Sequence, residues 1–449
     1  MGGAGDRWKG GRQVTSHRRA LPALVLGIAL VVSLCLYGGT RTPHASGAAT
    51  WALPSHPVSF TYWDGGDSTK STLLRQLIAE YEQLHPNIKI NFETDTPSDK
   101  VTVALSTGTA PALVEVADWN LPKYVAVHLL DPLPPAAWGR SSVAGVLDQY
   151  IPHLLDAMYD GHDLYAIPDQ QNAHSLFINN RLFREAGLDP AKDAPKTWDD
   201  VARLNKQLTK KQGDRIVQKG FEMRYACPDG HWQAQMFQIL LYQAGGTILQ
   251  GGRPAFNSDA GVRALQVWKS VTVAPQVTQN TCSSPYQDFA TEQDAMTFMG
   301  PNGGPSIERI NPKMKGNYTV APLPQIRPDH PATLVYAFNW AVYAKAPADE
   351  RAAAWDLVHF LSSRPLQWWS DIRFVQSRKG WFDTPEAKRD PFLGVYIHDL
   401  SIGRPVARTT HYQELQTILS RMIDRVILNN ADPKQALDQA AGEYARAAQ

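Results

Sequence analysis

The sequence predicts an α/β protein that is built of two lobes. Its 449 residues are more than one ordinary hydrophobic core accommodates, so two compact parts are expected. Strand-like runs and amphipathic helical runs alternate through the first half of the chain, which is typical of a parallel sheet flanked by helices. Apolar residues make up 43% and charged residues 19% of the sequence, as in an ordinary globular protein.

The first half supplies the alternating elements. A strand is expected over 58–62, ending at the Gly-rich turn of WDGG. Apolar residues then recur every three or four positions from Leu73 to Leu84, which predicts a helix that Pro86 ends. The segment IKINFET predicts a second strand, and SDKVTVALSTGTAPALVEVADWN predicts a helix, a break and a third strand. This order favours parallel pairing of the three strands.

Longer helices follow Asn180. The helix TWDDVARLNKQL has Thr197 as its N-cap and Asp200 three residues later, a variant of the capping box. HWQAQMFQILLYQAGG ends on a Gly pair, as helix C-termini often do. QDAMTFM and TLVYAFNWAVY are expected to be strands. The last helix, DPKQALDQAA, begins with Asp432 as N-cap and Pro433 at its first position.

Residues 1–50 are predicted to lie outside the fold, as a signal peptide or membrane anchor followed by a linker. Positive charge in SHRR precedes an apolar run over 21–37, which is the arrangement of an export signal. HASGAA offers small residues for cleavage, Cys35 offers an alternative lipidation site, and an uncleaved anchor is a third possibility. We therefore expect an exported protein, at the extracellular face of the cytoplasmic membrane or in the periplasm.

Two cysteines remain after this segment. Cys227 and Cys282 both lie in loop-like sequence, and an oxidising compartment favours their pairing. We expect a disulfide between them, with two separate buried thiols as the alternative.

Several classes of chemistry find no support in the sequence. The 44 basic and 43 acidic residues balance, so the chain has no excess of positive charge that would attract nucleic acid. No zinc-ligand spacing, nucleophile elbow or phosphate-binding loop is present, and no pair of carboxylates stands out as catalytic. We therefore expect no metal, no cofactor and no enzymatic activity. The 13 tryptophans suit either core packing or stacking on sugar rings.

An ordered set of segments carries a family resemblance. DGHDLYAIP, the strand end Ile178–Asn179, LFREAGLD and TWDDVARL resemble the central signature of extracellular solute-binding proteins of carbohydrate ABC importers, the family of maltose-binding and glycerol-3-phosphate-binding proteins. YQAGGTIL, EQDAMTFMG, AAAWDLVHFLSS and DPKQALDQAA follow in the order of that family. Together these segments span nearly all of residues 56–445.

The resemblance implies a two-lobe periplasmic-binding-protein fold of class II. Each lobe would be a mixed, mostly parallel sheet flanked by helices, and the ligand cleft would lie at the hinge. One lobe would comprise 56–167 and 320–345, and the other 168–319 and 346–445. The polar stretch from Asp160 to Asn180 falls where such chains first cross between the lobes.

The resemblance also implies a function. The chain would be a monomeric receptor that binds a sugar or small oligosaccharide and delivers it to the permease subunits of an ABC importer. A glycerophosphodiester or glycerol-3-phosphate ligand is the alternative within this fold, although Gln416 stands where glycerol-phosphate binders have an arginine. A glycan-active enzyme and a sensory partner of a membrane kinase are further alternatives.

The candidate ligand contacts are polar and aromatic side chains at expected strand ends and at the expected crossing. Carboxyl ends of parallel strands face the cleft, and the amides of the sequence DQQNA need partners that ligand hydroxyls or hinge backbone would supply. Solvated turns, helix caps and core packing are the alternatives for individual residues. The predicted set is Trp63, Asp64, Asp67, Asp118, Trp119, Gln170, Gln171, Asn172, Trp232, Asn302, Tyr336, Phe338, Asn339, Trp340, Arg373 and Phe374.

Overall fold

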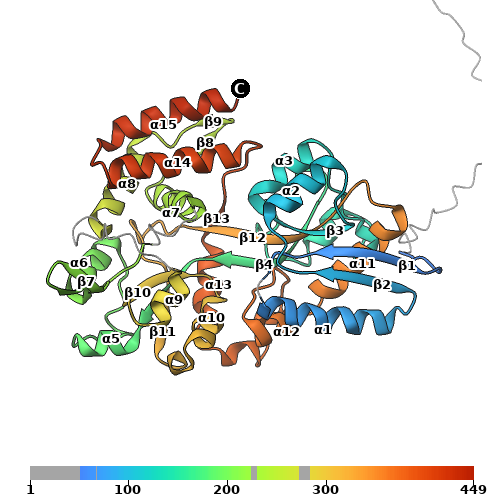
Figure 1. The fold of residues 1–449 in the computed structure, drawn as a ribbon, viewed down its shortest axis with the longest axis horizontal. Helices are drawn as coiled ribbons and strands as arrows, with labels where there is room; N and C mark the ends of the chain where they lie inside the picture. Colours follow the sequence, from blue (N-terminus) through green and yellow to red (C-terminus); the bar gives the residue numbers. More distant parts are fainter. Residues whose placement is uncertain (1–50, 67, 224–229, 273–283) are drawn as a thin grey trace, which may run out of the picture. The chain divides into compact units, whose positions relative to one another are not determined.

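The computed structural model describes residues 51–66, 68–223, 230–272 and 284–449, and Ala48–Gln449 form one compact unit (Figure 1). The expected export segment with Cys35, the candidate contact Asp67, and the predicted Cys227–Cys282 disulfide lie outside the described residues. Among the helices of the described ranges, none combines the length and the apolar character needed to cross a membrane.

The first sheet contains six strands in the order β13-β12-β3-β1-β2, and β4 pairs with β12 off this path. Its members are β1 (Val58–Trp63), β2 (Ile88–Glu93), β3 (Leu113–Ala117), β4 (Ile167–Ala173), β12 (Thr333–Val342) and β13 (Gly403–Pro405). Strand β1 runs parallel to β2 and β3, as predicted, while β12 runs antiparallel to β3 and β4. Three helices pack around it, namely α1 (Ser68–Leu84), α2 (Ser98–Thr107) and α11 (Ala348–Ser362).

The second sheet departs from the expectation of mostly parallel strands. It consists of β5 (Ser175–Asn179), β10 (Met296–Met299) and β11 (Tyr318–Ala321), in the order β10-β5-β11. Both pairings are antiparallel, so the predicted direction is wrong for this sheet. Alternation of strands and helices predicts direction only when one helix connects neighbouring strands, and here several helices separate β5 from β10.

Helices form most of the second lobe. Helices α7 and α14 contact each other, α15 packs on both α14 and α8, and α6 packs on α8. The capping box of Thr197 and Asp200 and the N-cap of Asp432 are present as predicted. The helices of this lobe are α5 (Asn180–Glu185), α6 (Trp198–Leu208), α7 (Gly230–Gln243), α8 (Asp259–Thr272), α9 (Pro285–Ala290), α10 (Gly303–Ile310), α14 (Tyr412–Ile427) and α15 (Pro433–Ala447).

Shorter elements complete the described chain. They are the helices α3 (Leu121–Ala126), α4 (Val143–Leu147), α12 (Pro365–Ile372) and α13 (Leu393–Ser401), and the two-stranded pairs β6 (Lys210–Gln212) with β7 (Arg215–Gln218) and β8 (Leu249–Gln250) with β9 (Arg253–Pro254).

The chain crosses from the first sheet to the second between β4 and β5, with His174 alone between the two strands. Every residue of both strands is buried, so the amides of the sequence DQQNA lie within the buried strand β4 itself. Helix α11 contacts β1, α1 and β4, although the predicted boundary assigned it to the second lobe. The lobe limits stay a prediction, and these contacts argue for moving α11 to the first lobe.

Candidate functional site

Strand pairing brings three of the predicted segments together. Strand β12 lies between β3 and β4, side by side with both (Figure 1). Phe338 is therefore opposite Gln170, and Tyr336 is opposite Asn172. Asp118 follows directly on β3 and begins a short 3₁₀ helix over Asp118–Asn120. The ends of β3 and β4 and the middle of β12 thus form one surface at the crossing between the sheets.

Aromatic rings from both lobes meet at this surface. We call them the hinge aromatic cluster; its members are Trp119, His174, Trp232, Phe298, Tyr336, Phe338 and Tyr412. Ring centroids lie 5.7 Å apart for Trp119 and Phe338, and 6.0 Å apart for Trp232 and Tyr336. Trp119, Trp232 and Phe338 are only half-buried, so part of each ring faces solvent. Such rings suit stacking on the apolar face of a ligand.

Asp118 is the carboxylate of this surface. Its Oδ2 accepts a hydrogen bond of 3.0 Å from the Ala337 backbone N–H, while its buried Oδ1 has no partner among the described residues. Burial raises the pKa of Asp118 to about 8, because the loss of hydration outweighs the backbone hydrogen bonds. A buried polar atom without a partner is costly, and a ligand hydroxyl could donate to this oxygen.

The amides of β4 divide into two kinds. Gln170 donates to Asn172 Oδ1 at 3.0 Å, and the buried Nδ2 of Asn172 has no partner within the described ranges. Gln171, in contrast, donates to the Tyr336 carbonyl at 3.3 Å and accepts from Ser377 at 3.2 Å. Asn172 therefore offers a donor to a ligand, whereas Gln171 holds the hinge backbone.

Gly300 and Asn302 approach the same amide. A Cβ built on Gly300 would lie 2.9 Å from Asn172 Oδ1 and 3.1 Å from Asn302 Oδ1. The absence of a side chain at Gly300 thus allows this turn to lie against β4. Asn302 is half-buried and makes no capping hydrogen bond to α10. The structure therefore brings Asn302 beside Asn172, as a shared ligand site would require.

Asp64 is engaged elsewhere. It is fully buried and accepts hydrogen bonds from the Tyr62 hydroxyl at 2.6 Å and the Gly66 N–H at 2.7 Å. Its Oδ2 also lies 2.9 Å from Nζ of Lys70. With these partners Asp64 fixes the end of β1 and leaves little for a ligand.

Lys70 lies among three carboxylates, and we call these four residues the Lys70 network. Its Nζ lies 2.6 Å from Asp169 Oδ2 and also contacts Glu115, in addition to Asp64. The three carboxylates supply oxygens within 4.8 Å of one another, a spacing at which a metal ion could be held. The ammonium of Lys70 takes the place of such a cation.

The charges of this network do not balance, since three carboxylates surround one ammonium. Burial alone would lower the pKa of Lys70, but attraction to Asp169, Asp64 and Glu115 outweighs it and raises the pKa. Burial raises the pKa of Glu115 and of Asp169, the proximity of Asp64 adding to both. Burial would raise the pKa of Asp64, but Lys70 and the hydrogen bonds from Tyr62 and Gly66 together outweigh it and lower the pKa. The network therefore favours a protonated carboxyl at Glu115.

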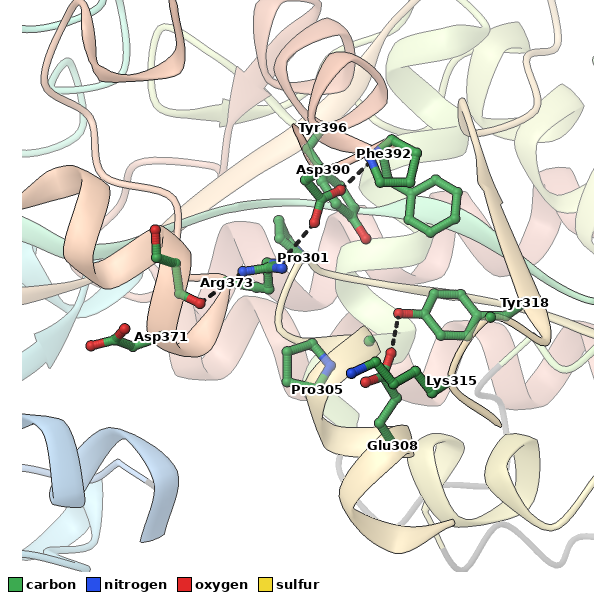
Figure 2. A pocket seen from close by; sticks show the side chains of 14 residues that line it. Pro301, Pro305, Glu308, Lys315, Tyr318, Asp371, Arg373, Asp390, Phe392 and Tyr396 are labelled. Carbon is green, nitrogen blue, oxygen red and sulfur yellow. Dashed lines mark hydrogen bonds and ion pairs between the residues drawn. The ribbon is translucent and has the colours of Figure 1, made fainter. Parts of the chain in front are cut away.

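Four other candidates lie away from the surface. Trp340 is fully buried in the core of the first sheet, and its indole donates to the Tyr62 hydroxyl at 2.8 Å. Asn339 is fully buried and donates to the carbonyls of Val116 and Ala337. The other two lie at the end of α12, where Phe374 stacks on Trp368 and Arg373 lines a separate pocket (Figure 2).

Trp63 has a mixed environment. The ammonium of Lys100 lies 3.9 Å from the centre of its indole ring. Its buried Nε1 has no hydrogen-bond partner in the described part of the chain. Trp63 ends β1, but no ring contact joins it to the hinge aromatic cluster among the described residues.

Sequence reasoning missed several residues that shape this region. Lys70, Glu115 and Asp169 are absent from the predicted set, because they meet only through contacts between segments far apart in the sequence. A signal existed for Lys70, which lies four residues before Leu74 on the buried face of α1 and so occupies an apolar position. His174 and Tyr412 join the aromatic cluster only through contacts between distant segments.

Comparison with known proteins gives a family and a fold. A family model described as "Bacterial extracellular solute-binding protein" matches residues 65–368. The "Arabinooligosaccharide-binding protein" of Bacillus subtilis (strain 168) is 22% identical over 412 residues, which cover 82% of this chain and 88% of that protein.

Two solved structures illustrate the fold. An ABC transporter solute-binding protein from Thermotoga lettingae TMO, bound with α-D-tagatose, has a TM-score of 0.72 at 23% identity and covers 86% of this chain and 98% of its own. The GacH receptor of Streptomyces glaucescens GLA.O, solved unliganded and with acarbose, has a TM-score of 0.73 at 18% identity, with coverages of 87% and 98%. These likenesses confirm the predicted two-lobe class II fold.

Proposed function

Because the chain belongs to the family of bacterial extracellular solute-binding proteins, we propose that it is an exported receptor for a neutral sugar or small oligosaccharide, which it delivers to the permease of an ABC importer. One observation supports a neutral saccharide as the class of ligand. Half-exposed rings of Trp119, Trp232 and Phe338 lie beside the unpaired Oδ1 of Asp118 and the unpaired Nδ2 of Asn172. Of the relatives described above, one is named for arabinooligosaccharide, and the two solved structures hold tagatose and acarbose.

Binding would combine stacking with hydrogen bonding. The aromatic rings supply flat apolar faces for the C–H face of a sugar ring. Asp118 Oδ1 forms a hydrogen bond with one hydroxyl, and Asn172 Nδ2 donates to another, so both buried groups gain the partner they lack. No covalent step is involved. Glycoside hydrolysis needs two carboxyl groups across the scissile bond, and the surface at the hinge offers Asp118 alone among its described residues.

A glycerophosphodiester is the second candidate, and Arg408 is the observation that would favour it. This arginine lies close enough to Asp118 to oppose the rise of its pKa. Its Nη1, however, already donates to the carbonyls of Asp156 at 2.7 Å and Tyr159 at 2.9 Å. A phosphate is recognised best by an arginine fork with two free nitrogens. The neutral sugar is therefore the better match.

Calorimetric titration of the full-length chain tests the proposal. The ligands are arabinotriose, maltotriose, mannotriose and, for the second candidate, glycerophosphocholine. We expect one of the trisaccharides to bind and Asn172→Ala to weaken this binding at least about tenfold. Asn257→Ala alters a half-buried asparagine that donates to Asp438 away from the hinge; it is the matched control and should bind as the wild type does.

Two results would contradict the proposal. The first is binding of glycerophosphocholine in preference to every saccharide, which would support the second candidate. The second is release of reducing sugar from the trisaccharides by the pure protein, which would indicate an enzyme.

A further inference from the structure

A separate cavity of about 580 Å³ lies at the junction of α10, α12 and α13 (Figure 2). Its lining includes Pro301, Pro305 and Glu308 in or just before α10, Lys315 and Tyr318 after it, Asp371 and Arg373 at the end of α12, and Asp390, Phe392 and Tyr396 around the start of α13. No member of the hinge aromatic cluster lines it. Its volume falls within the range of roughly 300–1,000 Å³ that is typical of small-molecule sites.

One wall of the cavity is aromatic and fixed in place. The ring centroids of Tyr318 and Phe392 lie 5.6 Å apart, with their planes tilted by 35°. Tyr318 also stacks on Phe177 and donates its hydroxyl to Glu308 at 2.9 Å. Figure 2 shows both rings beside the charged side chains of the cavity. These contacts hold a flat surface in a defined orientation, which is what ring stacking on a ligand needs.

The facing wall is built around Arg373. Its Nε pairs with Asp390 at 2.8 Å, and its Nη1 donates to the carbonyls of Trp369 and Ser370 at 2.8 and 2.9 Å. Its Nη2 has no partner among the residues that the structure describes. The guanidinium is thus immobilised with one nitrogen still able to donate.

The backbone of Arg373 adds an independent observation. It ends α12 with φ of 60°, in the left-handed region where a helix usually places glycine. A side chain at this position carries strain that glycine would avoid. Strained non-glycine residues concentrate at functional sites. The presence of arginine at this position therefore points to a use of its side chain in the cavity.

The remaining polar groups define the ligand. Arg373 cannot offer the two-nitrogen fork that carboxylates and phosphates prefer, because its Nε and Nη1 are occupied. What remains are single donors, at Nη2 and at the exposed ammonium of Lys315, and single acceptors, at the carboxylates of Glu308 and Asp371. Isolated donors and acceptors beside an aromatic face suit separate hydroxyl groups on a neutral ring.

We propose that this cavity is a second saccharide-binding pocket, in which a sugar ring lies against Tyr318 and Phe392 while Arg373 and Lys315 donate to its hydroxyls. The inference takes its ligand class from the proposed function but uses none of the residues at the hinge. Pro301 lines this pocket and Asn302 follows it in the chain, so one long oligosaccharide or two separate sugars could occupy both places.

The test compares variants of the two places. Full-length Arg373→Gly and Lys315→Ala are titrated with arabinotriose, maltotriose and mannotriose and with the hexasaccharide of each series. We expect about tenfold weaker binding of the longer saccharides, or loss of a second binding event, in both variants. Lys313→Ala removes an exposed lysine outside the pocket and should match the wild type. Arg373→Gly should fold, since glycine adopts this backbone freely.

The outcomes separate the two proposals. Suppose that both pocket variants bind with wild-type affinity and stoichiometry, whereas Trp119→Ala no longer binds. This result would overturn the inference of a second pocket and would still agree with the proposed function. Binding that persists in Trp119→Ala and disappears when Lys315→Ala is added would support the second pocket directly. Failure of every saccharide to bind the wild type would overturn both.

Discussion

The ammonium of Lys70 joins three strands of the first sheet through single side chains. Asp64 follows directly on β1, Glu115 lies on β3, and Asp169 lies on the crossing strand β4. The carbonyl of Asp169 also accepts a hydrogen bond from Gln376, a residue of the segment after α12. A single side chain thus sets the position of the crossing strand relative to β1 and β3.

This arrangement predicts that substitutions within the Lys70 network lower the free energy of unfolding by unequal amounts. Lys70→Met should lower the free energy of unfolding by about 3–5 kcal/mol, because it leaves buried carboxylates without a cation. Glu115→Gln should change it by no more than about 1 kcal/mol, because the raised pKa of Glu115 means that a neutral group already occupies this position. Urea unfolding at pH 7 measures both.

Lys89→Met is the matched control for the Lys70 network. Lys89 forms an exposed ion pair with Glu82, and such pairs contribute about 0–1 kcal/mol. A loss from Glu115→Gln as large as that from Lys70→Met would show that Glu115 is ionised, and would refute the protonated arrangement.

Asp118 predicts a dependence of stability on pH. Its pKa is raised to about 8 in the folded protein, so between its ordinary value near 4 and about 8 the folded state keeps a proton that the unfolded state releases. Stability is therefore lost as pH rises through this window. Asp118→Asn removes this titration and should raise the melting temperature by a few degrees at pH 8.5, with little effect at pH 4.5. Equal shifts at both pH values would contradict the raised pKa.

At the scale of elements, helices were predicted better than strand directions. Helix α6 begins at Trp198 after the predicted capping box of Thr197 and Asp200, because that signal is local to four residues. Strand β5 contains a contiguous apolar run, whereas the buried strand β4 carries the polar sequence DQQNA, which no apolar pattern marks as a strand. The antiparallel pairing of the second sheet was not predicted, because it depends on contacts between segments far apart in the sequence.

One displaced site candidate lies further along a strand whose earlier residues reach the hinge. Trp340 lies on the same face of β12 as Phe338, because the pairing of β12 with β3 is regular over both residues. The register shift between β12 and β4 places its extra residue, Asp169, in β4 and leaves β12 regular. Trp340 is fully buried in the core of the first sheet, whereas Phe338 is half-buried beside the second core. Alternation along the strand therefore does not distinguish these two residues.

The turn before α10 supplies a prediction for ligand binding. Gly300→Ala would place a methyl group 2.9 Å from Asn172 Oδ1, so the amide must move. We expect affinity for the sugar to fall at least about tenfold while the melting temperature changes by only a few degrees. Calorimetric titration and thermal unfolding of the same sample measure the two effects.

Gly394→Ala is the matched control for this turn. Gly394 lies in α13, and an added Cβ there meets nothing within 4 Å, so affinity should be unchanged. A Gly300→Ala variant that binds as tightly as this control would show that Asn172 does not contact the ligand.

At the scale of the whole molecule, the family resemblance predicted what local patterns could not. The order of the family-like segments placed the crossing at Asp160–Asn180, and the chain does pass from the first sheet to the second between β4 and β5. The sequence predicts the ligand site less well than the fold, because the surface of the site depends on which side chains remain half-exposed. Trp119 and Phe338 do so, while the equally aromatic Phe374 stacks within the core.

Two hydrophobic cores share the strands at the crossing. On β12, Leu334 and Tyr336 belong to one core, whereas Val335 and Trp340 belong to the other. On β5, Phe177 likewise packs with the core of the first sheet, while its neighbours along the strand pack with the second core. Neither core can therefore unfold without disturbing a strand whose side chains also pack in the other core.

This sharing has a thermodynamic consequence. We expect the two lobes to unfold in a single cooperative transition, with equal calorimetric and van't Hoff enthalpies, although the chain has the length of two domains. Differential scanning calorimetry of the full-length chain measures both enthalpies. Two resolved heat-absorption peaks would mean that each lobe melts by itself, and that the shared strands do not couple the cores.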